Sequence, residues 1–161
     1  MSRLPITAPA TTAAAFAHIN AVKAPTIDDL KLMVFLEASG LSGYNGLAAN
    51  SDNAEIAALL QANGREELAH AHRVAQVITL LSGEAFPPPA DSENPYVAAS
   101  APPLTRALLE GLVRAETNGD DLYESWAASL DNADAAALLR QNGREEIRHA
   151  ERAAKALALL G

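Results

Sequence analysis

Apolar residues recur every three or four positions along four long stretches of the chain, the spacing of one buried face of an α-helix. In residues 52–82 this stripe reads Ile56, Leu60, Asn63, Glu67, His70, Val74, Val77 and Leu81. In residues 131–160 it reads Ala135, Leu139, Asn142, Glu146, His149, Ala153, Ala156 and Leu160. The other two stripes, in 26–49 and 104–129, are Leu30, Val34, Glu37, Leu41, Tyr44 and Ala48, and Leu109, Leu112, Glu116, Tyr123, Trp126 and Leu130. The pattern predicts four helices around one core, with polar residues inside every stripe.

Local signals agree with two helix pairs. Thr26 with Asp29, Asp52 with Glu55, and Asp131 with Asp134 have the spacing of capping boxes or their near relatives. The segment GEAFPPPADSENPYVAASAPP resists helix formation, so we expect a crossover between the second and third helices. Two tight hairpins joined by one long crossover form the ferritin-like connection. We therefore expect an all-α, ferritin-like antiparallel four-helix bundle over residues 26–161, preceded by a tail or a short extra helix within residues 1–25.

The two halves of the chain repeat each other. Residues 54–82 align with residues 133–161 at an offset of 79, and 16 of the 29 positions are identical. The strongest stretch is AALLQANGREELAHAHR against AALLRQNGREEIRHAER, and the same offset carries Glu37 onto Glu116 and Tyr44 onto Tyr123. The sequence therefore predicts two duplicated helical hairpins.

Composition excludes several classes of partner and site. The formal net charge is −8 and there is no basic run, which disfavours binding to nucleic acid or to anionic membranes. The chain has no cysteine, so thiolate metal sites, disulfides and a rubredoxin module are excluded. No apolar run approaches membrane-spanning length, and we expect a soluble cytoplasmic protein.

Charged residues in an apolar core require compensation. Four buried, unpaired carboxylates would each cost several kcal/mol and would repel one another. Two divalent cations balance four carboxylates, and Glu-x-x-His places two ligating groups on one face of a helix. The candidate metal ligands are Glu37, Glu67, His70, Glu116, Glu146 and His149. The alternative is that duplication of a surface helix copied the motif without forming a site.

Residues around these candidates have simpler expected roles. Glu66 and Glu145 lie about 100° round the helix from the candidate ligands, so we expect them to be solvated or paired with Arg65, Arg144 or other surface groups. His18 and His72 are expected to be ordinary surface or packing histidines. Gly64 and Gly143, in helix interiors, predict a local bulge or a close helix approach.

Two tyrosines lie in the same stripes as the candidate glutamates. Tyr44 and Tyr123 follow Glu37 and Glu116 by seven residues, so each phenol could hydrogen-bond a carboxylate or donate an electron. The alternative is that each ring packs in the core with its hydroxyl on any acceptor. Asn63 and Asn142, one turn before the Glu-x-x-His motifs, are candidate hydrogen-bond donors beside the site.

These residues together resemble the ferritin-like superfamily, and most closely its rubrerythrin-type di-iron branch. The resemblance covers residues 26–160. It implies that Glu67 and Glu146 bridge the metals, that Glu37 and Glu116 are terminal ligands, and that His70 and His149 each serve one ion. Rubrerythrins carry an additional glutamate three residues beyond the third-helix ligand, and this chain has Gly119 there, which argues against peroxidase-type ligand switching. They commonly carry a rubredoxin domain, and this chain has none.

The function implied is redox activity toward O2 or peroxide, of the ferroxidase or peroxidase type, with Tyr44 and Tyr123 as candidate participants. The two metals are expected to be iron, with manganese or a mixed iron–manganese pair as alternatives. A di-iron oxygenase acting on an organic substrate is a second hypothesis, which predicts an apolar channel reaching the metals. A non-catalytic metal-binding or structural bundle is a third. The electron donor is external and unknown, and a homodimer is expected from the resemblance.

Overall fold

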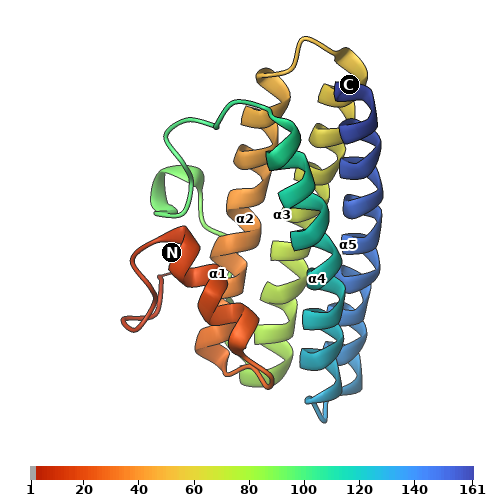
Figure 1. The fold of residues 1–161 in the computed structure, drawn as a ribbon. Helices are drawn as coiled ribbons and strands as arrows, with labels where there is room; N and C mark the ends of the chain where they lie inside the picture. Colours follow the sequence, from red (N-terminus) through yellow and green to blue (C-terminus); the bar gives the residue numbers. More distant parts are fainter. Residues whose placement is uncertain (1–2) are drawn as a thin grey trace.

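The computed structural model describes residues 3–161, which form five α-helices and one short 3-10 helix. Their bounds are α1 Thr12–Ala21, α2 Ile27–Ala49, α3 Ala54–Ser82, η1 Asp91–Glu93, α4 Arg106–Ala128 and α5 Ala133–Leu160. No strand occurs in the described part of the chain. The predicted all-α class and the ferritin-like bundle of four long helices are confirmed (Figure 1).

The bundle is built from two antiparallel hairpins, α2 with α3 and α4 with α5 (Figure 1). The crossover after α3 returns along the whole bundle, so α4 runs in the same direction as α3. The hairpins meet mainly through α3 and α5, the two helices that carry the Glu-x-x-His motifs. Both motifs therefore lie at the contact between the halves.

The helix starts follow the capping rules with one shift in register. At α2 the predicted capping box is present, with the Thr26 amide donating to Asp29 at 2.8 Å. At α3 and α5 the predicted caps Asp52 and Asp131 are wrong, because Asn53 and Asn132 are the N-caps and both helices begin two residues later than expected. The Asn53 side chain accepts from the Glu55 amide at 2.9 Å. A side-chain oxygen in the cap position satisfies a free amide at the helix start, and Asn provides it as well as Asp does.

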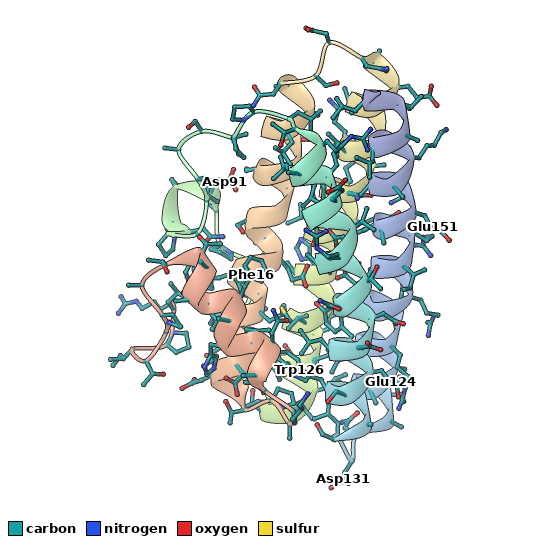
Figure 2. All side chains as sticks on the ribbon, viewed as in Figure 1. Phe16, Asp91, Glu124, Trp126, Asp131 and Glu151 are labelled. Carbon is teal, nitrogen blue, oxygen red and sulfur yellow. The ribbon has the colours of Figure 1, made fainter. Side chains whose placement is uncertain are left out.

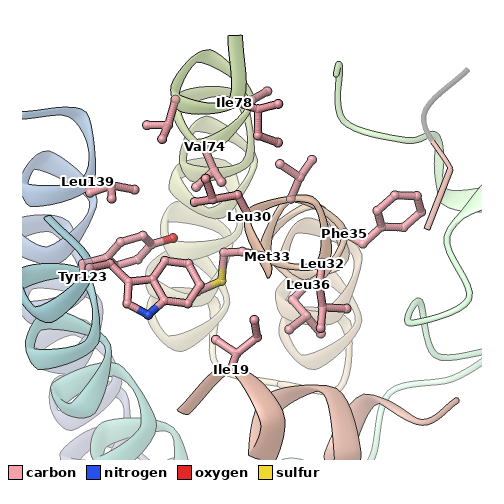
Figure 3. Close-up of a cluster of buried hydrophobic side chains, with 14 of the residues drawn as sticks. Ile19, Leu30, Leu32, Met33, Phe35, Leu36, Val74, Ile78, Tyr123 and Leu139 are labelled. Carbon is pink, nitrogen blue, oxygen red and sulfur yellow. The ribbon is translucent and has the colours of Figure 1, made fainter. Parts of the chain in front are cut away.

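The apolar core is divided by a polar layer. One cluster includes Leu30, Val74 and Trp126 at its centre, all buried, and the other includes Leu60 and Leu109. Figure 3 shows side chains of the first cluster meeting from several helices, with Leu30 and Met33 of α2 between those of α3 and α4. Full burial of one such side chain contributes roughly 1.5–3 kcal/mol. The predicted stripes thus supply the core, and their polar members lie between the two clusters.

The N-terminal segment and the crossover cover α2. A helix in the first segment, α1, lies within residues 1–25, where a tail or a short extra helix was expected (Figure 1). The Tyr96 hydroxyl of the crossover donates to the Pro9 carbonyl at 2.7 Å, and the Asn94 amide donates to the Phe35 carbonyl at 2.7 Å. These bonds tie the two irregular segments to each other and to the bundle.

Gly64 of α3 and Gly143 of α5 lie in continuous helices at points where two helices approach closely. A Cβ on Gly64 would lie 3.0 Å from Tyr44 Cβ.

Exposed carboxylates such as Glu124 and Glu151 lie on the outside of the bundle (Figure 2). None of the helices in the described region is both long enough and apolar enough to cross a membrane.

Candidate metal centre

The six candidate ligands gather in the polar layer between the two core clusters. Two overlapping groups of side chains each bring one ligand atom per residue within 4.8 Å of the others. The first group is Glu37, Glu67, His70 and Glu146, and the second is Glu67, Glu116, Glu146 and His149. Each group thus has three carboxylates and one imidazole, and Glu67 and Glu146 belong to both. Glutamate and histidine sets of this kind suit two divalent ions that share the common carboxylates.

The imidazoles provide the test of whether these residues fit a metal pair. Both rings are fully buried, and their Nδ1 atoms lack a hydrogen-bond partner among the described residues. His70 Nδ1 lies 3.2 Å from Glu146 Oε1 and 3.5 Å from Glu37 Oε2, and His149 Nδ1 lies 3.3 Å from Glu67 Oε1. Buried polar atoms are almost always satisfied, and these two nitrogens, which face carboxylate oxygens, are positioned to act as ligands of a cation. The donor set fits a dimetal centre.

The far nitrogen of each imidazole is held by a carboxylate from the other half of the chain. His70 Nε2 lies 3.1 Å from Glu145 Oε2, and His149 Nε2 lies 3.1 Å from Glu66 Oε2. An ionised carboxylate only accepts, so each Nε2 carries a proton, and the Nδ1 lone pair of the neutral ring would face the carboxylate cluster when a metal is bound. A metal-ligating histidine commonly donates its other N–H to such a carboxylate.

Glu66 and Glu145 were expected to be solvated or paired with Arg65, Arg144 or other surface groups. Both do pair with arginines, but with other ones and beside a histidine of the other half. Arg152 donates to Glu66 at 2.9 and 3.0 Å, and Arg73 donates to Glu145. These arginines lower the pKa of both carboxyl groups against the opposing effect of burial, to about 2 for Glu66. Each glutamate therefore stays ionised as the acceptor that its histidine requires. Helix geometry predicted that these residues leave their own stripe, but the adjacent helix covers that side.

A signal for this second set was present in the sequence. The duplicated stretch extends from Glu66 and Glu145 to the arginines at positions 73 and 152, which the offset of 79 superimposes. The candidate donors Asn63 and Asn142 also lie here, each donating to the backbone carbonyl of a histidine across the bundle, His149 and His70, at 3.2 and 3.3 Å. Spacing within one helix did not show that these contacts cross between the halves.

The two tyrosines also cross between the halves. The Tyr44 hydroxyl donates to Glu116, and the Tyr123 hydroxyl donates to Glu37. Burial, together with the neighbouring carboxylates, raises the pKa of both phenols well above the usual value. Each tyrosine therefore remains a protonated donor, which leaves the second oxygen of its glutamate free to face the centre.

Protons stabilise the carboxylate cluster when no metal is bound. Burial, followed by repulsion from neighbouring carboxylates, raises the pKa of Glu67 well above its usual value, and burial does the same for Glu146. Burial acts against the charge on His70 as well, but contact with Glu146 and Glu37 raises its pKa to about 10. Binding of cations must displace these protons, so metal affinity at this centre is expected to rise with pH.

Two glycines give the shared glutamates their room. A Cβ on Gly40 would lie 2.7 Å from Glu67 Cγ, and one on Gly119 would lie 3.0 Å from Glu146 Cδ. Such contacts are shorter than normal van der Waals separations. A glutamate at position 119, as the rubrerythrin-type pattern would have it, would therefore require the Glu146 side chain to shift by a few tenths of an ångström.

A cavity of about 470 Å³ lies against the centre, between α2 and α4. Its wall includes the four core glutamates and both tyrosines, and α1 and the crossover contribute to its sides. The remaining lining is mostly apolar, with Met33, Leu36, Leu47, Leu112 and Leu122 among its side chains. The four core glutamates therefore border a largely apolar cavity that opens to the surface at Gly43, Ala115 and Asn118.

A comparison with protein families finds a match that covers the bundle. The rubrerythrin family model matches residues 29–157, which include all six candidate ligands. Searches of curated proteins and of solved structures returned no significant match. With its helical bundle and its buried glutamate and histidine cluster, the chain belongs to the rubrerythrin family of ferritin-like di-iron carboxylate proteins.

Proposed function

We propose that this protein holds two iron ions and uses them to reduce O2 or peroxide, as a ferroxidase or peroxidase. Glu67 and Glu146 would be shared by both ions, Glu37 and His70 would bind one ion, and Glu116 and His149 would bind the other. The observation that carries the proposal is the pair of overlapping ligand groups, each with an orphaned imidazole nitrogen turned toward it.

Paired iron(II) ions would supply two electrons from adjacent positions, which favours two-electron reduction over release of a radical. The chain's own residues prepare that chemistry. The two arginine-held glutamates fix the imidazole tautomers, and the tyrosine hydroxyls fix the terminal carboxylates. The apolar clusters above and below the layer shield the carboxylates from water on those two sides and strengthen the charge interactions there.

The remaining parts of the proposed function rest on the resemblance to the family. Manganese or a mixed pair remains an alternative, because glutamate and histidine donors discriminate poorly between the two metals. An external electron donor, a homodimer and a cytoplasmic location stay predictions. A second candidate function, oxidation of an organic substrate by the same centre, is favoured by the apolar cavity against the carboxylates.

The test is metal analysis of protein that has been anaerobically reloaded with Fe(II) and then exposed to oxygen. Wild type is compared with a Glu67→Ala plus Glu146→Ala variant, and with a control in which the exposed Glu124 and Glu151 are both replaced by Ala. We expect about two irons per chain in wild type and control, and loss of iron in the core variant. Oxygen consumption is expected in the wild type and the control, which bind iron, and not in the core variant.

Three results separate the hypotheses. Two irons with oxygen uptake support the redox proposal. Two irons without oxygen or peroxide consumption indicate a protein that only binds metal. Negligible iron in all three proteins, each shown to be folded, refutes the metal centre and leaves a duplicated structural bundle.

A further inference from the structure

The two imidazoles of the centre are connected to the outer face that α3 and α5 form together. Their rings are stacked with centroids 5.0 Å apart, and each Nε2 contacts a glutamate of the other helix at 3.1 Å. The Arg148 side chain is 49% exposed, and its Nη2 lies 3.3 Å from Glu145 Oε1 and 3.8 Å from Glu66 Oε2. Two successive contacts, through a glutamate and an arginine, therefore lead from each imidazole to solvent on this face.

The opposite side of the centre offers no such connection. The cavity between α2 and α4 is lined by the four core glutamates and by neither histidine, and α1 and the crossover contribute to its walls. Charged groups of a partner protein would lose hydration against its largely apolar lining. A protein partner that is held by charge therefore finds better access to the centre at α3 and α5.

Positive charge gathers on the outer face although the chain as a whole is acidic. Outside the six candidate ligands, residues 65–73 and 144–152 contain five arginines and three glutamates, a net charge of +2. The other residues outside the ligand set carry −6 together. A patch opposite in sign to the rest of the molecule orients a charged partner during its approach.

Three of the five arginines are exposed, and these are Arg65, Arg144 and Arg148. Arg144 lies one helical turn before Arg148, so the two share a face of α5, and Arg65 is the counterpart of Arg144 in the repeat. Among the described residues, neither Arg65 nor Arg144 forms an ion pair. Both guanidinium groups are therefore available to carboxylates of a partner.

We propose that the outer face of α3 and α5, centred on Arg65, Arg144 and Arg148, is the docking surface for an acidic electron-carrier protein. This inference rests on the proposed function, because it names the external donor that reduces the iron pair. Two one-electron carriers convert two Fe(III) ions into two Fe(II) ions, and no covalent bond forms or breaks in the transfer. The electrons enter on the imidazole side of the centre, where the contacts through Glu66 and Glu145 reach the surface.

The experiment uses a reduced, acidic plant-type [2Fe–2S] ferredoxin as the probe. Iron-loaded protein is oxidised with O2, freed of O2 and mixed with the probe in a stopped-flow spectrometer, which gives the second-order rate constant of reduction. The test variant is Arg65→Glu plus Arg144→Glu. Its matched control is Arg106→Glu plus Arg114→Glu, because these are exposed arginines of α4 and the net charge changes equally. Arg148 is left unchanged, since it contacts the glutamates that hold the imidazoles.

At low salt we expect the test variant to be reduced by ferredoxin on the order of tenfold more slowly than the control variant. The difference should shrink between about 0.01 M and about 1 M ionic strength, because the screening length falls from about 30 to about 3 Å. Reduced methyl viologen, a small cation that needs no docking surface, should reduce the test variant no more slowly than the wild type. That measurement, with the iron content of every sample, shows that the centre is intact.

Several outcomes would overturn the docking surface. Equal slowing of both variants would mean that net charge alone matters. A wild-type rate that does not change with salt would exclude steering by charge, and protein that methyl viologen reduces but ferredoxin does not would exclude this class of partner. A wild-type dimer that the Arg65→Glu plus Arg144→Glu variant no longer forms would assign the face to a second copy of the chain.

Failure of the proposed function is distinguished by a binding measurement that needs no iron. Isothermal titration calorimetry at low salt compares ferredoxin binding to iron-free wild type and to both variants. Binding that the test variant loses and the control keeps, in a protein that takes up no iron, would refute the proposed function and leave the docking surface standing. Iron uptake without any ferredoxin binding would do the reverse.

Discussion

Replacing Glu145 by Gln gives the sharpest test of how the centre is organised. The substitution keeps the size of the side chain and removes the negative charge that accepts the His70 Nε2 proton. Of the two four-residue ligand groups, the one of Glu37, Glu67, His70 and Glu146 contains that imidazole and the other does not. The variant should therefore weaken one of the two metal positions much more than the other.

The expected magnitude follows from the role of the carboxylate. Loss of a carboxylate that orients a metal-bound histidine costs 10- to 100-fold in metal affinity, or about 1.4–2.7 kcal/mol. Glu145 is well buried and also accepts from Arg73, so solvent screening is weak and the upper part of the range is expected. Glu66→Gln should have the same effect on the position that uses His149, because the contacts repeat between the halves.

The assay is an anaerobic Fe(II) titration against a competing chelator, which gives the two stepwise affinities of wild type and each variant. Glu124→Gln is the control, since that residue forms an exposed ion pair with Arg140 far from the centre. One position weakened in each single variant, and both in the double variant, would support the reasoning. Unchanged affinities in folded variants, or an equal loss at both positions from one substitution, would refute it.

Two further predictions concern the fold. Gly64→Ala should reduce the free energy of unfolding by up to about 2 kcal/mol, because its Cβ would lie 3.0 Å from Tyr44 Cβ and overpacking outweighs the gain in helix propensity. Gly111→Ala, which meets no such contact, should stabilise the protein by up to about 1 kcal/mol. Urea unfolding of both variants checks the sign, and a stabilised Gly64→Ala would contradict the close approach. Asp29→Ala should cost about 1 kcal/mol near neutral pH by removing the capping box with Thr26. Burial acts to raise the pKa of Asp29, but bonds from Thr26 and His18 outweigh it and lower the folded-state pKa below 3.8, so this stability is present above pH 3.8 and is lost as the pH falls. Urea unfolding across pH should show the gap between wild type and variant closing below that pH, and a gap independent of pH would contradict the assignment.

The helices and the candidate ligands could be predicted because they depend on spacing along one helix. A stripe with a period of 3.6 residues is fixed by local geometry, so Glu67 and His70 had to face the same way as Leu60 and Val74. The duplication then indicated that two such helices and two glutamates from their partners share one layer. Helix starts were less certain, because Asp52 and Asn53 are both capable caps and the choice depends on how the turn enters the helix.

The contacts made between the halves could not be derived in this way. Glu66 and Glu145 leave the stripe of their own helix, so sequence reasoning placed them in solvent or in surface ion pairs. The packing of α3 against α5 instead sets each of them against the histidine and the arginine of the other helix. Which side chain lies opposite which depends on the relative position of two helices that are 79 residues apart, and no local pattern encodes it.

The sequence by itself thus determined an all-α bundle, its internal repeat and the six residues that enter its polar layer, because each follows from helical periodicity and from the cost of burying charge. Only the tertiary structure decided which groups hold the two imidazoles, where the tyrosine hydroxyls donate, and that an apolar cavity separates α2 from α4 beside the carboxylates. These features arise from the distance and register between helices, which are set by the packing of the whole core.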